Sequence, residues 1–122
     1  KPRQDGRQIS MRLIELKNCI LGKNYSLSIA YVSKKKSREI NKKYRKKDKA
    51  TNVLSFALRD NLGELVLCKT LIRREIKNQP KILKRNFEDQ LRFLVIHGML
   101  HLKGLKHGKK MEKLEKKYLI PH

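Results

Sequence analysis

The segment HGMLHLKGLKH holds three of the four histidines of this chain within eleven positions. His97 and His101 are four residues apart, so on a helix their side chains would leave the same face with Cβ atoms about 5–6 Å apart. Gly104 can end that helix, because glycine accepts the left-handed conformation that reverses a chain. The reversal would bring His107 back toward the other two rings. The segment therefore predicts a cluster of three imidazoles.

Such a cluster is typical of a metal site. Two imidazole nitrogens at helical spacing can bind one ion about 2.0–2.1 Å from each of them. A third nitrogen still leaves a coordination position open, which is the arrangement of catalytic rather than structural sites. We expect one divalent metal ion on His97, His101 and His107, with zinc favoured, although nickel or copper would also accept three nitrogen donors. The alternative is a pair of histidines satisfied within the core. His122 has no such context and is expected to face solvent.

The spacing of these histidines equals the metzincin protease pattern HExxHxxGxxH at its metal-related positions. The glutamate of that pattern, which activates water in the proteases, is replaced here by Gly98. A zinc peptidase that uses this mechanism is therefore disfavoured.

The charge of the chain indicates a polyanionic partner. The sequence has 32 Lys and Arg against 11 Asp and Glu, a formal net charge of +21. The segment SKKKSREINKKYRKKDK is densely basic, whereas SFALRDNLGELVLC has almost no basic residues. Such unevenness favours a binding face over a uniformly solubilising surface, and RNA is a common large polyanion in cells.

The length of 122 residues predicts a single domain, with about residues 1–8 as a flexible lead-in. No apolar run approaches the roughly 20 residues of a membrane span, so no membrane partner is expected. Cys19 and Cys68 stand apart in apolar surroundings, and we interpret both as reduced core thiols. Unpaired cysteines predict a cytoplasmic location.

Hydrophobic periodicity and turn residues predict a small mixed sheet flanked by helices, which is an α+β class. The expected strands are residues 26–32, 52–58 and 64–68, the second of them central because it is apolar on both sides. The expected helices are residues 9–20, a segment after a Ser33 cap, residues 70–77, a segment from an Asn86 cap to about residue 103, and a short last helix around residues 111–118.

Three segments, in the right order, resemble one known family. HGMLHLKGLKH resembles the HGxLHLxGYDH signature of the YbeY family, bacterial metal-dependent endoribonucleases. NKKYRKKDKATNVLSFAL (residues 41–58) is similar to that family's YRxKDxPTDVLSFP segment, and LGELVLC (residues 62–68) is similar to its LGDIVIC strand. The similarity runs from about Arg38 to His107, more than half of the chain.

The resemblance implies a zincin-like α+β fold in which His97, His101 and His107 hold one metal ion, usually zinc. It implies that Arg45, in the YR pair, is the catalytic arginine. The implied activity is cleavage of single-stranded RNA, in maturation of the 3′ end of small-subunit rRNA and in ribosome quality control. The implied partners are rRNA and either ribosomal proteins or the small ribosomal subunit.

The chemistry of these residues fits that activity. A metal on three histidines lowers the pKa of bound water to about 7 and polarises a phosphoryl oxygen. The planar guanidinium of Arg45 can donate two hydrogen bonds to a phosphate. Nearby lysines would hold backbone phosphates without reading bases. These lysines are Lys42, Lys43, Lys46, Lys47 and Lys49.

One departure from the family pattern concerns charge at the metal. The family's Asp before the third histidine is Lys106 here, and a lysine cannot orient a ligand or balance the charge of a metal. Glu64, at the acidic position of the LGD segment, is a candidate to replace that carboxylate beside the histidines. The departure also supports a second hypothesis, a non-catalytic RNA- or ribosome-binding assembly factor with a structural or vestigial metal site.

Overall fold

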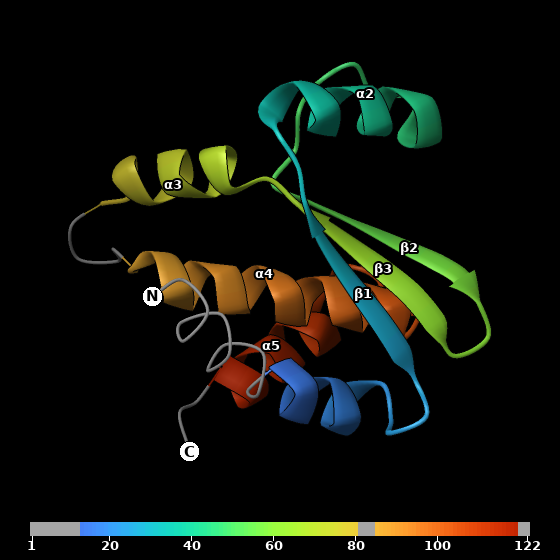
Figure 1. Ribbon diagram of the computed structural model, residues 1–122. Coiled ribbons are helices and arrows are strands. Elements are labelled where there is room, and N and C mark those ends of the chain that lie inside the picture. Colours follow the sequence, from blue (N-terminus) through green and yellow to red (C-terminus); the bar gives the residue numbers. More distant parts are fainter. Residues whose placement is uncertain (1–12, 81–84, 120–122) are drawn as a thin grey trace, which may run out of the picture.

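The computed structural model describes residues 13–80 and 85–119. The expected lead-in, the first four residues of the expected first helix and His122 lie outside these residues. The chain forms a helix over residues 13–20, followed by seven further elements (Figure 1). In order these are β1 (Ser26–Tyr31), α2 (Lys34–Arg45), β2 (Val53–Arg59), β3 (Leu62–Leu67), α3 (Lys69–Lys77), α4 (Phe87–Leu102) and α5 (Lys109–Leu119).

The three strands form one mixed sheet in the order β1-β3-β2. β1 runs parallel to β3, and β2 pairs antiparallel with β3. Only Asp60 and Asn61 separate β2 from β3, and Asn61 adopts a left-handed φ of 58°, as tight hairpins require. The α+β class with a small mixed sheet and flanking helices is confirmed.

The expected central position of the second strand is wrong, because β2 lies at the edge of the sheet and β3 at its centre. Apolar residues on both sides of a strand carry no information on how many strands pair with it, and in β2 Leu58 is 57% exposed. In β2 one face is directed toward α4, where the Ser55 hydroxyl donates to the Gly98 carbonyl at 3.2 Å. The other face contributes Phe56 and Leu58 to a cleft beside α2.

The helix α2 begins as expected, with the Ser33 hydroxyl accepting from the Lys36 N–H. Its apolar residues are not its buried ones, since Tyr44 is 55% exposed. The buried residues are Ser37 and Asn41. Both are polar because they bind the backbone of the following loop, as described below.

The core lies between the sheet and α4, the most apolar helix. Figure 1 shows α4 on one side of the sheet and α2 on the other. Gly98 allows a close approach, because a Cβ there would lie 2.6 Å from Leu65 Cδ2 and 3.0 Å from Ser55 Oγ. Of the two cysteines, Cys68 is buried as expected, whereas Cys19 is exposed, which corrects the expectation of two core thiols.

Candidate metal centre and cleft

The histidine cluster is built by α4 and the turn that ends it. Asn86 caps the helix, its side chain accepting from the Asp89 N–H at 2.8 Å. At the other end Gly104, at φ 106°, donates to His101 O at 2.9 Å and Leu105 donates to Leu100 O at 3.0 Å. These two bonds form a Schellman motif around a left-handed glycine. The chain reversal predicted at Gly104 is confirmed.

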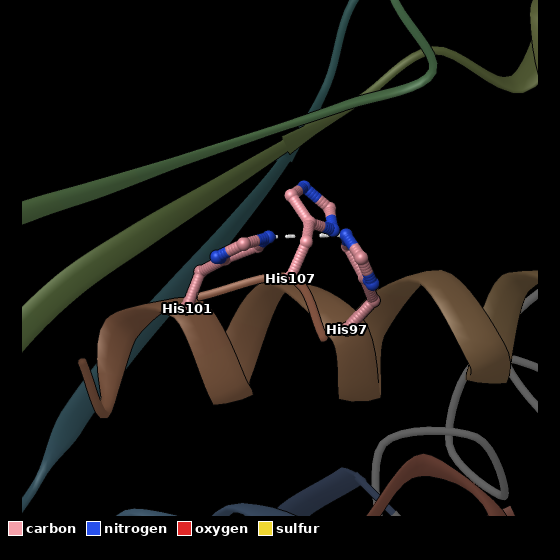
Figure 2. Close-up of side chains that lie close together, drawn as sticks. All are labelled: His97, His101 and His107. Atoms are coloured by element: carbon pink, nitrogen blue, oxygen red, sulfur yellow. Dashed lines mark hydrogen bonds between the residues drawn. The ribbon is translucent and has the colours of Figure 1, made fainter. Parts of the chain in front are cut away.

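The reversal brings the three predicted histidines together. Figure 2 shows His97 and His101 rising from α4 and His107 entering beside them from the turn. Their ring centroids lie 4.6–5.1 Å apart. One ring nitrogen of each residue lies within 4.8 Å of those of the other two. The three-histidine group could therefore bind a metal ion.

Hydrogen bonds fix which nitrogen of two rings is free to bind. His101 Nδ1 lies 3.0 Å from the carbonyl oxygen of Leu105, which can only accept. His97 Nδ1 lies 2.5 Å from Glu115 Oε2. In neutral rings this arrangement makes both Nδ1 atoms the N–H donors and leaves the lone pair on each Nε2.

These two lone pairs point at one another, since His97 Nε2 and His101 Nε2 are 3.1 Å apart. Two ligand nitrogens at tetrahedral angles and about 2.0–2.1 Å from one ion lie roughly 3.3 Å apart. The spacing therefore suits an ion between the two nitrogens. Burial is the main cause that lowers the pKa of His101, followed by the proximity of His97. A lower pKa favours the neutral imidazole, which is the metal-binding form.

The histidines line an open cleft of about 620 Å³, and Arg45, at the end of α2, lines the same cleft. Arg45 Nη2 donates to Ser55 O at 2.5 Å, and its guanidinium stacks 4.8 Å from the ring centroid of Phe56. These two contacts hold the guanidinium at the exposed edge of β2. Arg45, predicted from the sequence, therefore shares a cleft with the three histidines.

The loop between α2 and β2 is anchored by the two polar residues buried in α2. Ser37 Oγ donates to Thr51 O at 2.7 Å and accepts from Thr51 N at 2.9 Å. Asn41 Nδ2 donates to Lys49 O at 2.8 Å. The same loop is bound to α3, where Asn52 Nδ2 donates to Glu75 Oε2 at 2.7 Å. These contacts place the loop along the cleft.

The five predicted RNA-binding lysines do not lie together. Lys47 and Lys49 line the cleft. Lys43 borders a different cleft on the other face of the sheet, with its ammonium 5.2 Å from the Tyr44 ring. Lys42 and Lys46 are exposed and line neither cleft. Only two of the five lysines therefore line the cleft that the histidines line.

The structure does not place Glu64 beside the histidines. Successive residues of a strand point to opposite faces, and in β3 the side chain of Leu65 faces α4. Glu64 therefore points to the other face, where it borders the cleft beside α2 and its Oε2 accepts from Ser28 Oγ at 3.5 Å. The prediction that Glu64 supports the histidines is wrong for this reason.

The carboxylate beside the cluster is Glu115 of α5, which the sequence analysis missed. A signal was present in the sequence. Met111, Glu115 and Tyr118 follow the i, i+4, i+7 spacing of the buried face of a helix, and a carboxylate at such a position needs a partner. Glu112 and Lys116, which are four residues apart on the same helix, are not among the ion pairs of the described residues.

Comparisons with known proteins agree with this architecture. A family model described as Endoribonuclease YbeY matches residues 3–120. The chain is 34% identical over 110 residues to an Endoribonuclease YbeY of Mycoplasmopsis synoviae, covering 82% of this chain and 68% of that protein. It is 39% identical over 98 residues to an Endoribonuclease YbeY of Chromobacterium violaceum, covering 74% of this chain and 56% of that protein.

A solved structure shares the fold. The solution structure of TM1509 from Thermotoga maritima superposes with a TM-score of 0.64 at 30% identity, covering 93% of this chain and 81% of that one. The matches to the curated relatives named above span 56–68% of their length. Because the family model covers almost all of the chain and two of its three motif segments line one cleft, the chain belongs to the YbeY family.

Proposed function

We propose that this protein is a metal-dependent endoribonuclease that cleaves phosphodiester bonds in single-stranded RNA. The observation that carries the proposal is the cleft itself, an open space of about 620 Å³ that is lined by three imidazoles and an arginine. The names of the relatives support the same activity. None of the described helices has the length and apolar character needed to cross a bilayer.

The residues of the cluster fit a divalent metal ion, which we propose to be zinc. The donor set is three imidazoles, and hydrogen bonds to Glu115 and Leu105 leave the Nε2 lone pairs of two of them free. His107 is exposed, so its ring can rotate toward the other two. A metal held there would act as a Lewis acid on a phosphoryl oxygen and would make water more acidic.

Arg45 would bind the scissile phosphate in the same cleft. One of its N–H groups is used by Ser55 O, and the remaining N–H groups of the guanidinium can donate to phosphate oxygens. Because the group is already oriented by Ser55 and Phe56, little conformational entropy is lost when it binds. Its fixed charge would stabilise the negative charge that develops on the phosphate oxygens.

Lys47 and Lys49 would hold the neighbouring phosphates of the strand. Lysines bind phosphate as point charges and do not select a base. The peptide groups of the loop are fixed by Asn41 and by Ser37, so both side chains start from a defined backbone. This arrangement suits the backbone of a single strand, which can bend into an open cleft.

We further propose that the substrate is rRNA and that the reaction belongs to maturation of the small-subunit 3′ end and to ribosome quality control. The net charge of +21 suits a site rich in RNA, such as the ribosome. The free cysteines of the structure fit a cytoplasmic location.

The second candidate function is a non-catalytic RNA- or ribosome-binding assembly factor. Lys106 favours it, because this exposed cation stands next to His107 in the sequence and disfavours a second positive charge nearby. In that case the cluster would be a structural or vestigial site.

Elemental analysis of the purified protein, followed by cleavage of a labelled single-stranded RNA with and without chelator, tests the proposal. The expected result is one equivalent of metal per chain, cleavage that a chelator abolishes and cleavage that returns when zinc is added back. Binding should weaken with salt by roughly 0.7 log units per log salt for each phosphate neutralised. Salt-dependent binding without metal-dependent cleavage would instead support the assembly factor.

A further inference from the structure

Glu115 is an unusual residue for such a basic chain. Within residues 13–80 and 85–119 it is the one charged side chain in the buried class, with a relative exposure of 7%. A buried carboxylate is costly unless it is paired and hydrogen-bonded. The partner of Glu115 is His97 Nδ1, at 2.5 Å. The buried charge is therefore directed at the histidine cluster and not at a surface cation.

The contact joins two helices that are separated by the Gly104 turn. Glu115 lies on α5, one helical turn after the buried Met111, so the packing of α5 on α4 determines where its carboxylate lies. His97 is held on one side by this bond and has its other ring nitrogen 3.1 Å from His101 Nε2. The contacts run from the Glu115 carboxylate through the His97 ring to His101.

Charge gives this contact a second role. Three neutral imidazoles add no negative charge to a divalent cation, and the carboxylate expected before His107 is replaced by Lys106. Glu64 cannot compensate, because it lies on the other face of the sheet. A carboxylate that accepts from a ligating histidine raises the basicity of that ligand and fixes its orientation.

We propose that Glu115 is the positioning residue of the metal centre, which holds His97 with Nε2 toward the ion and supplies the negative charge that residue 106 does not. The proposal rests on the metal centre proposed above. It also makes α5 part of the site, although α5 contributes no metal ligand.

The test compares Glu115→Gln with Glu112→Gln, an exposed glutamate on the same helix. Zinc affinity is measured by competition with a chromophoric chelator, well below the unfolding temperature, and the thermal stability of the metal-free proteins is measured in parallel. We expect Glu115→Gln to bind zinc about 10- to 100-fold more weakly, while Glu112→Gln binds as the unmodified protein does. The downfield NMR resonance of the His97 Nδ1 proton should also shift in Glu115→Gln only.

The outcomes separate this proposal from the metal centre itself. If the unmodified protein binds no metal, the metal centre fails. The metal centre stands and the role of Glu115 is refuted if the unmodified protein binds zinc and the affinity of Glu115→Gln matches it within a factor of about two. Such a change is smaller than the roughly tenfold loss of affinity expected when the hydrogen-bond partner of a metal ligand is removed. A purely structural contact would lower the thermal stability of metal-free Glu115→Gln and leave the zinc affinity of its folded form unchanged, which also refutes the proposal.

Discussion

The two walls of the cleft are encoded differently. The histidine wall comes from eleven consecutive residues, His97 to His107, in which a helix, a glycine turn and the ring spacing are all local properties. The arginine and lysine wall comes from the end of α2 and the loop after it. Its side chains are placed by contacts with β2, α3 and the buried residues Ser37 and Asn41.

The difference lies in what a motif can specify. Helical periodicity and a left-handed glycine bring three nearby side chains to the same place. In a run of lysines every residue has the same chemistry, so the direction of each side chain depends on the packing of the whole segment. Substitutions in the histidine wall should therefore have large effects at a few residues, whereas substitutions of the lysines in the second wall should have graded effects.

The largest effect is expected from His101→Ala, because the side chain of His101 is one of three clustered imidazoles and a lost ligand cannot be replaced from elsewhere in the local motif. Zinc affinity should fall by more than about 100-fold, which is more than is lost when only the hydrogen-bond partner of a metal ligand is removed. RNA cleavage should disappear. Chelator competition and a gel assay measure the two. Salt-dependent RNA binding should persist, because the lysines remain. Cleavage that survives in this variant would point to a contaminating nuclease.

Arg45→Ala tests the second wall. Cleavage should fall by about 100- to 1,000-fold, as when a donor to a developing negative charge is removed. Zinc affinity should stay unchanged, because Arg45 contacts Ser55 and Phe56 and no histidine. Arg74→Ala, at an exposed position of α3, is the matched control and should cleave normally. A loss of zinc in Arg45→Ala would show that the two walls are not independent.

Much of the fold could be predicted from local signals. The caps at Ser33 and Asn86 and the turn at Gly104 are set by side-chain oxygens and by a glycine, and all three are confirmed. The edge position of β2 could not be predicted, since strand order depends on contacts between distant segments. The apolar residues of β2 carry no information on which strands pair with it.

The site shows the same division. His97, His101 and His107 meet as predicted, because their spacing defines their geometry. Glu64 was assigned by its similarity to an acidic position, and the alternation of β3 turns it to the opposite face. Glu115 was missed because its importance depends on how α5 packs against α4.

Gly98→Ala probes the packing on which the histidine wall depends. The new Cβ would lie 2.6 Å from Leu65 Cδ2, and Leu65 is fully buried. Overpacking of this kind costs about 1–3 kcal/mol in the free energy of unfolding, measured by chemical denaturation. At Gly104, where nothing lies within 4 Å of an added Cβ and φ is 106°, the strain comes from the backbone. Asn should therefore be milder than Ala at position 104 and harsher than Ala at position 98.

The smallest effects concern the lysines. Lys47→Ala/Lys49→Ala removes the two that line the cleft, and Lys42→Ala/Lys46→Ala removes two exposed lysines outside it. Both double variants lose the same charge, so a binding mode that depends on net charge alone predicts equal losses. If the loop directs the strand, the first variant should lower the salt slope of RNA binding by up to about 1.4, at roughly 0.7 per phosphate contact, and the second should lower it less. Equal slopes would mean that the lysines act through net charge alone. The position of the loop along the cleft would then not matter for RNA binding.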